Sequence, residues 1–276
     1  MDLGLAGKST IITGGSGGIG RGLVLAFAGE GANVVIATRD GAKGQEVADA
    51  AKDLPGDVIV VPTDVTRAEA VEAMVAATVE RFGPVDVLVN NAGGVFHPCK
   101  FLDKSREDAE WEVNLNIWGV YNCTREVGRG MVDRKTGSIV NITSNSSLEP
   151  EASSQVALYG GTKGFVNSFS KALAYEWGPE GVRVNSIAPG WIVPHEQDHV
   201  GAGSFWKKYG YDFFGTPEQM AESAAAGEAL PSVTSQPIRR IGRPEDIADL
   251  ALFFASDRAA HLTGQLVSVS GGAYMP

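Results

Sequence analysis

The sequence contains little cysteine and an excess of acidic residues, and both features limit what the protein can be. Its 276 residues include two cysteines, Cys99 and Cys123, which are too few for a disulfide framework and are typical of a reducing compartment. The 23 Lys and Arg against 33 Asp and Glu give a formal net charge of −10. This charge argues against nucleic acid or an anionic membrane as the main partner, so we expect any functional cation to act locally.

Long hydrophobic runs, repeats and linkers are absent from the sequence as well. No run approaches the ~18 apolar residues that a membrane span needs, and the first residues lack the charged and apolar regions of a secretion signal. The hydrophobic content of 43% is enough for one large core. We therefore expect a cytoplasmic protein with one domain over residues 1–276, carrying a substrate-lid insertion at about 194–237.

A glycine-rich turn follows a short β-branched run near the N-terminus. Residues 9–13 read STIIT, glycines follow, and apolar residues then recur at helical spacing from Leu23. Between a strand and a helix, such a turn lets a pyrophosphate approach the backbone and bind the N–H groups of the helix N-terminus. The turn predicts dinucleotide binding, with these candidate contacts: Gly14, Ser16, Gly18, Ile19 and Gly20.

The end of the next β-branched run decides which dinucleotide binds. Residues 33–38 read NVVIAT, and Thr38 is followed by Arg39. An acidic residue here would bind the adenosine ribose, whereas an arginine would pair with a 2′-phosphate. The pattern favours NADP(H). NAD(H) is the alternative, because Asp40 is adjacent and would serve the ribose if the strand end were shifted by one or two residues.

Two further predicted strands, at residues 58–62 and 85–89, end in polar residues. A doubly wound sheet keeps its ligand crevice outside the carboxyl ends of its strands. An aspartate there is placed to accept a bond from an adenine amino group, while asparagines and small residues suit a sharp backbone turn against a cofactor. These strand ends add the following candidate cofactor contacts: Asp64, Val65, Asn91, Ala92 and Gly93.

A helical segment near the middle of the chain carries a tyrosine and a lysine four residues apart. Apolar residues recur at helical spacing after Tyr159, so Tyr159 and Lys163 project from one face of one helix. A tyrosine hydroxyl titrates near pH ~10, and an ammonium beside it favours the phenolate. We interpret the pair as a proton donor and acceptor. Taken alone, Tyr-x-x-x-Lys also describes an ordinary polar pair on a surface helix.

Three motifs occur in order along the chain: Thr13-Gly14-x-x-x-Gly18-x-Gly20, Asn90-Asn91-Ala92-Gly93 and Tyr159-x-x-x-Lys163. In order and spacing they resemble those of the short-chain dehydrogenase/reductase family, over nearly the whole chain. The resemblance implies a single-domain α/β fold, a doubly wound, Rossmann-like parallel sheet of about seven strands with helices on both faces and a helical substrate lid. It also implies an NAD(P)-dependent oxidoreductase that acts on CH–OH groups, and a homotetramer.

The same resemblance implies roles for three catalytic groups. Tyr159 would give or take the hydroxyl proton, and Lys163 would lower the tyrosine pKa and bind the nicotinamide ribose. A serine would bind the substrate oxygen and polarise the carbonyl. Ser144 is favoured because it stands at the end of a predicted strand, whereas the family's usual distance to the tyrosine favours Ser146.

Two more segments match the family. An asparagine would hold a water that relays the proton, and the pattern Asn-Leu-x-Gly selects Asn116, with Asn114 as the alternative. After a predicted strand at residues 182–188, a turn would cover the nicotinamide. Pro194 stands where the family usually has a threonine and leaves one side-chain contact open. The expected contacts of this turn are Pro189, Gly190 and Ile192.

The predicted lid is unusually aromatic. Loops over a cofactor crevice set substrate choice in such folds, so aromatic side chains here predict a hydrophobic secondary alcohol or ketone, whether cyclic, aromatic or polycyclic. The alternative is that they pack at a subunit interface or pin the lid to the core. The residues concerned are Phe205, Trp206, Tyr209, Tyr211, Phe213 and Phe214.

Two other functions compete with this interpretation. His195-Glu196-x-x-His199 matches the zinc-binding motif of many metalloproteases, and a zinc hydrolase would use both histidines. The motif follows Pro194 and precedes two glycines, with no long helix to hold it, so we expect no metal site. The second alternative is a non-catalytic NADP(H) sensor, which the intact Tyr159 and Lys163 disfavour.

Overall fold

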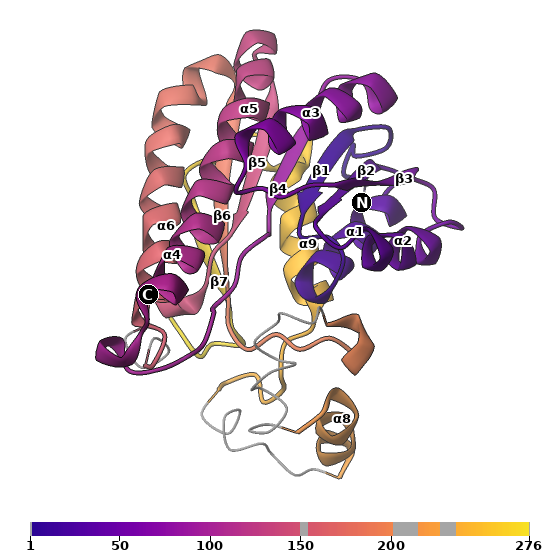
Figure 1. The fold of residues 1–276 in the computed structure, drawn as a ribbon. Coiled ribbons are helices and arrows are strands. Elements are labelled where there is room, and N and C mark those ends of the chain that lie inside the picture. The colour runs from indigo at the N-terminus through magenta and orange to yellow at the C-terminus, as the bar shows by residue number, and fades with distance from the viewer. Residues whose placement is uncertain (1, 150–153, 201–214, 227–235, 276) are drawn as a thin grey trace.

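Seven parallel strands form the centre of the computed structural model, which describes residues 2–149, 154–200, 215–226 and 236–275 (Figure 1). Several strands are continuous runs of Val and Ile, as expected where helices bury both faces of a sheet. The strands lie in the order β3-β2-β1-β4-β5-β6-β7, which confirms the predicted doubly wound fold. Their bounds are β1 Ser9–Thr13, β2 Asn33–Thr38, β3 Val58–Pro62, β4 Val87–Asn90, β5 Gly137–Ile142, β6 Val182–Pro189 and β7 Leu266–Val269.

Helices cover both faces of the sheet (Figure 1). Alternate residues of β2 supply two separate cores, with Val34 and Ile36 on one side and Val35 and Ala37 on the other. Within the described ranges, no helix is both long enough and apolar enough to cross a bilayer. One layer holds α1 Gly18–Gly29, α2 Gly41–Ala50 and α9 Pro244–Ala255; the other holds α3 Ala68–Phe82, α4 Arg106–Val113, α5 Gly119–Arg134 and α6 Ala157–Trp177.

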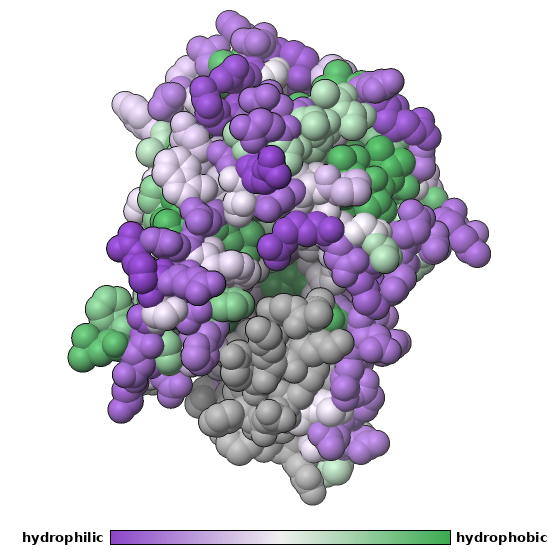
Figure 2. All heavy atoms as spheres, in the orientation of Figure 1, coloured by the Kyte–Doolittle hydropathy of each residue, from purple (hydrophilic) through white to green (hydrophobic). Residues whose placement is uncertain are grey.

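The strand order reverses between β1 and β4. From β1 the chain crosses to β2 and β3 on one side, then returns to β4 on the other side of β1. Such a switch point opens a crevice at the carboxyl ends of the strands. Figure 2 shows that this side of the molecule is mostly hydrophilic and is hollowed near that edge, where hydrophobic residues are visible beside the grey atoms.

Side-chain hydrogen bonds set where α2 and β4 begin, and the start of β4 differs from the predicted one. α2 begins at Gly41 because the Asp40 carboxylate caps it and accepts a bond from the Lys43 amide at 3.0 Å. β4 begins at Val87 rather than at residue 85. The preceding Asp86 carboxylate instead accepts a bond from the Ser9 amide at 3.0 Å.

The helix that follows β4 is interrupted by a π-helical segment, Asn114–Trp118, between α4 and α5. A π-helical turn holds one more residue than an α-helical turn, and such turns occur often at functional sites. The predicted lid lies partly outside the described residues, including all six aromatic residues from Phe205 to Phe214. Its described part contains a short helix, α8 Pro217–Ala225.

Candidate active site

The glycine turn after β1 has the geometry that a dinucleotide needs. Gly14 and Gly18 have positive φ angles of 67° and 53°, which other residues rarely adopt. A Cβ at Gly20 would overlap the Gly14 carbonyl, whereas a Cβ at Gly18 would meet nothing within 4 Å. No side chain caps α1 at Gly17. The turn therefore combines open space with an uncapped helix N-terminus, and it fits a pyrophosphate.

Asn91 and Thr13 join the ends of β4 and β1 beside this turn. The Thr13 hydroxyl accepts bonds from the Asn91 and Ala92 amides at 3.0 and 2.9 Å. The Asn91 side chain donates to the carbonyls of Thr13 and Gly14 at 2.9 and 3.2 Å. These four bonds hold the ends of β1 and β4 together and fix the floor of the crevice.

The end of β2 holds the residues predicted to select the dinucleotide. Ser16 and Thr38 share a hydrogen bond of 2.8 Å between their hydroxyls. Arg39 is exposed, while the carboxylate of Asp40 is engaged as the cap of α2. A small cavity of about 80 Å³ adjoins Ser16 and is also lined by the cations Arg21 and Lys43 and by the anions Glu46 and Asp198.

Asp64 and Val65 lie at the carboxyl end of β3. One oxygen of the Asp64 carboxylate accepts bonds from the amide and hydroxyl of Thr66 at 3.0 and 2.8 Å. Val65 is buried, and its carbonyl accepts a bond of 3.0 Å from the Asn122 side chain. These contacts fix the loop beside the predicted adenine position.

The turn after β6 is pinned to the segment that leads into α9. Ile192 pairs with Gly242 in an isolated parallel bridge and is 7% exposed. Pro194 stands where the family usually has a threonine. Its carbonyl accepts a 2.9 Å bond from the Arg243 guanidinium. Pro189 closes β6, and Gly190 packs so tightly on Ser270 that a Cβ would come within 2.9 Å.

Tyr159, Ser144 and Lys163 come together where β5 meets the start of α6. The Ser144 hydroxyl lies close enough to the Tyr159 hydroxyl to lower the Tyr159 pKa. The Lys163 ammonium is 3% exposed, donates to the Ile142 carbonyl at 2.9 Å and lies 5.8 Å from the Tyr159 ring centroid. Ser144 also caps its own turn by accepting a bond from the Ser146 amide at 3.1 Å. Ser144 therefore lies beside Tyr159, as the predicted role requires.

The two candidate asparagines point to different environments. Asn116 is fully buried, and its side chain exchanges two 2.9 Å bonds with the amide and carbonyl of Gly94. Asn114 is exposed. Because Gly93 has no side chain, Lys163 and Asn116 can both lie close to its backbone. A Cβ at this position would come within 2.7 Å of the Lys163 ammonium and 2.9 Å of the Asn116 oxygen. The structure therefore brings Asn116, not Asn114, to the Lys163 side of the crevice.

Burial changes both key pKa values, and one of them in the direction opposite to that expected. Desolvation raises the pKa of Tyr159 above its ordinary value, the bond from Ser144 opposes this, and the negative charge of Glu112 adds to it. Burial lowers the pKa of Lys163 to about 8. The pKa of Tyr159 therefore moves in the direction opposite to the expected depression, because burial has the largest effect on it.

The two histidines of the motif contact different residues. Glu196 has extended backbone angles, and only a short turn, Gln197–His199, follows it. His195 lies 3.1 Å from Glu245, whereas His199 lies 3.4 Å from Glu196. Within the ranges that the structure describes, no three His, Cys, Asp or Glu side chains are grouped to hold an ion.

One charged group near Tyr159 is not singled out by any sequence motif. Glu112 is completely buried one helical turn before Asn116, and it forms a 2.8 Å ion pair with Lys104. In sequence the two charges look like an ordinary solvated pair. The only available signal is the four-residue spacing from Glu112 to Asn116, which places both on one helix face.

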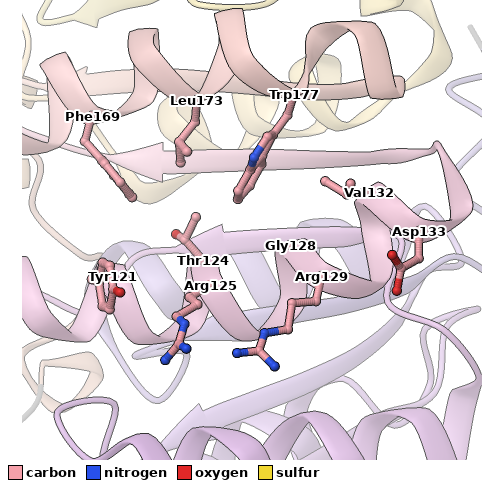
Figure 3. A pocket seen from close by; sticks show the side chains of 10 residues that line it. All are labelled: Tyr121, Thr124, Arg125, Gly128, Arg129, Val132, Asp133, Phe169, Leu173 and Trp177. Atoms are coloured by element: carbon pink, nitrogen blue, oxygen red, sulfur yellow. The ribbon is translucent and has the colours of Figure 1, made fainter.

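A cavity of about 500 Å³ lies outside the crevice, between α5 and α6 (Figure 3). Phe169, Leu173 and Trp177 point from α6 toward α5. Trp177 rests against Gly128, where a Cβ would come within 2.6 Å of the indole ring. This cavity belongs to an outer helical surface and not to the candidate active site.

Comparisons with known proteins agree with this geometry. A family model described as "Enoyl-(Acyl carrier protein) reductase" matches residues 14–274. The chain is 36% identical to L-fucose dehydrogenase from Bos taurus over 276 residues, covering 97% of this chain and 90% of that protein. It is 31% identical to the 3-oxoacyl-acyl-carrier-protein reductase FabG of Thermotoga maritima over 270 residues, covering 97% and 98%.

A solved structure is also similar over almost its whole length. It is a short-chain type dehydrogenase/reductase from Mycobacterium marinum, with a TM-score of 0.81 and 30% identity. The match covers 99% of this chain and 97% of that one.

Proposed function

The chain belongs to the short-chain dehydrogenase/reductase family, and from this premise we propose that it transfers a hydride between a nicotinamide cofactor and a hydrophobic secondary alcohol or ketone. One observation carries the proposal. The neighbouring hydroxyls of Ser144 and Tyr159 lie beside the buried ammonium of Lys163, at the edge of the sheet where the glycine turn opens.

Each residue of the proposed site has its own role in the reaction. The cofactor, when bound, would supply or accept the hydride. Ser144 donates a hydrogen bond to the substrate oxygen, and Tyr159 gives its proton to that oxygen during reduction or takes it during oxidation. Lys163 restores the Tyr159 proton and binds the nicotinamide ribose. Asn116 holds the Gly94 backbone in place. In the proposed mechanism it also orients a water that relays the proton.

We propose NADP(H) as the preferred cofactor. Arg39 is exposed at the end of β2, where a 2′-phosphate would lie, and the Asp40 carboxylate already caps α2. The nearby cations Arg21 and Lys43 add positive charge, although Lys43 is paired with Glu46 at 2.7 Å. A ribose without the phosphate would use neither the charge of Arg39 nor its fork of N–H donors.

We also propose a homotetramer built partly on the outer face of α5 and α6. The half-exposed Trp118 stacks edge-on against Tyr121, and the 40% exposed Phe165 stacks on Phe169. Together with the α5–α6 cavity, these aromatic rings form a face that a second copy of the chain would cover. Two cysteines without a disulfide are consistent with the cytoplasm as its location.

The proposal is tested by replacing Tyr159 with phenylalanine. Cyclic, aryl and steroid alcohols and ketones are screened with both NADP(H) and NAD(H), and the best substrate is then used for kinetics. We expect Tyr159→Phe to lower kcat by about 10²- to 10⁴-fold while cofactor binding, followed by fluorescence titration, stays within a factor of about two.

Tyr175 provides a matched control, because it lies on the same helix and is 90% exposed. Tyr175→Phe should leave both measurements unchanged. Near wild-type turnover by Tyr159→Phe contradicts the assignment. Tight NADPH binding without turnover of any carbonyl compound by the wild type supports a nucleotide sensor instead.

A further inference from the structure

A buried ion pair joins α4 to the loop that follows β4. The Lys104 ammonium and a Glu112 carboxylate oxygen are 2.8 Å apart, and their side chains are 5% and 0% exposed. Taking two charges out of water is costly, so a buried pair of this kind needs further hydrogen bonds. Here the loop backbone provides them.

The pair is bonded to three backbone groups of two consecutive residues. Glu112 accepts a bond from the Phe96 amide at 2.8 Å, and Lys104 donates to the carbonyls of Phe96 and His97 at 2.6 and 2.9 Å. His97 has a φ of 53°, an uncommon left-handed conformation for a residue with a side chain. The bonds to Lys104 and Glu112 therefore hold the loop in a shape that it would not adopt unaided.

The same loop touches both halves of the candidate active site. Gly94 is bonded to Asn116, and the Cys99 amide donates a 2.9 Å bond to the carbonyl of Gln155, just before α6. The Phe96 ring packs on Trp111 of α4 with centroids 4.8 Å apart. α4 itself packs against α6, the helix that carries Tyr159.

We propose that Lys104 and Glu112 are positioning residues, which fix the segment 94–97 as a rigid wall of the substrate crevice and set the charge beside the Tyr159 hydroxyl. The inference rests on the proposed function, because it concerns the same site. It goes further by giving a catalytic task to a pair that touches neither cofactor nor reacting atoms.

A second oxygen of Glu112 is unpaired, which distinguishes this carboxylate from a purely structural one. Within the described part of the chain, Glu112 Oε2 is buried and has no hydrogen-bond partner. A buried acceptor without a partner costs stability. A charge kept at that cost, whose field reaches Tyr159 and raises its pKa, is consistent with an electrostatic role.

Among the residues that the structure describes, the groups that act on Tyr159 come from three elements. From its own helix comes the Lys163 ammonium, from α4 comes Glu112, and from the turn after β5 comes the neutral Ser144 hydroxyl. From the loop, Lys104 faces Glu112 and not Tyr159, while His97 pairs with Asp108 at 3.3 Å. Removing the Glu112 charge should therefore ease ionisation of Tyr159.

Four variants separate positioning from charge. Glu112→Gln keeps an acceptor for the Phe96 amide but removes the charge, so the limb of the pH profile of kcat/KM that reports Tyr159 should move to lower pH. Glu112→Ala removes the anchor as well and should lower kcat/KM by at least tenfold. Lys104→Met should do the same, with partial rescue in Lys104→Arg. The Kd for the cofactor should stay within about twofold of the wild type in all of them.

Glu110 provides the control on the same helix, because it is 57% exposed and pairs with Arg106. Glu110→Gln and Glu110→Ala should leave the pH profile and kcat/KM unchanged. Hydrogen exchange of the Phe96 amide supplies a measurement independent of activity. It should be slow in the wild type and faster in Glu112→Ala.

The possible results are distinct. Wild-type kinetics in folded Glu112→Ala and Lys104→Met, or an unmoved pH limb in Glu112→Gln, overturns the proposal. Unchanged exchange at Phe96 in Glu112→Ala overturns its structural half even if no substrate is known. If instead the wild type turns over no carbonyl compound while Phe96 responds as expected, the proposed function fails and the loop anchor stands.

Discussion

Lys163 offers a test in which activity and stability should move in opposite directions. Its ammonium is 3% exposed and has one described hydrogen bond, to the Ile142 carbonyl at 2.9 Å. Burial lowers the pKa of this ammonium from 10.5 to about 8. A depressed pKa for a base means that the folded state disfavours the charge, so Lys163→Met should stabilise the protein while it abolishes turnover.

The size of the effect follows from the pKa difference. Each pH unit corresponds to about 1.4 kcal/mol, so the step from 10.5 to about 8 gives a penalty of about 3 kcal/mol for the wild type at neutral pH. Loss of the bond to the Ile142 carbonyl offsets about 1 kcal/mol of the gain in Lys163→Met. We therefore expect a net increase of about 2 kcal/mol in the free energy of unfolding at pH 7.

The sign of the pH dependence follows from proton binding. Below pH 8 both folded and unfolded wild type carry the proton on Lys163, and the whole penalty is present. As the pH rises from about 8 toward 10.5, the folded state loses its proton first, so the stability of the wild type rises. The gap between Lys163→Met and the wild type should therefore shrink through this window.

Urea unfolding at pH 7 and pH 9.5, at one protein concentration and without cofactor, measures the gap. Lys171→Met is the control, because Lys171 is exposed on the same helix and its replacement should give no pH-dependent gap. A Lys163→Met protein that is less stable than the wild type at pH 7, or a gap that widens with pH, refutes the reasoning.

Three further predictions concern packing and reactivity. Gly20→Ala forces a Cβ onto the Gly14 carbonyl, so we expect a loss of about 1–3 kcal/mol in stability together with weaker cofactor binding, measured by urea unfolding and fluorescence titration. Phe254→Ala empties a fully buried core position and should cost about 3–5 kcal/mol, visible as a lower urea midpoint with unchanged slope. Burial raises the pKa of Cys123 to about 12, so a thiol reagent at pH 8 should label the partly exposed Cys99 and reach Cys123 only after unfolding.

The sheet was predictable because buried parallel strands leave a plain signature. Three strands, β1, β2 and β3, have the predicted bounds, since each is a short run of β-branched and apolar residues bounded by turn residues. The helix carrying Tyr159 and Lys163 was predictable for a similar reason. Its apolar residues keep a 3.6-residue period for several turns.

Other features depend on contacts between distant segments and leave little trace in sequence. In the sequence, the π-helical segment around Asn116 looks like ordinary helix. The bonds between the Asn116 side chain and Gly94 form only when the chain folds. The raised pKa of Tyr159 depends on how much water the fold removes, which no local pattern reports. Lys104 and Glu112 look solvated until folding brings them together against the Phe96 backbone.

The π-helical segment also makes the length of this stretch of chain critical. A helix advances by roughly 100° per residue. Between Asn114 and Trp118 the π-helical turn already holds one residue more than an α-helical turn, so one further residue would swing everything on one side of the insertion about a quarter-turn around the helix axis. Either Glu112 would then leave the Phe96 backbone, or the buried Cys123 and Val127 would leave the core. Natural variation should therefore tolerate substitutions at the outward Asn114 far more readily than an added residue here.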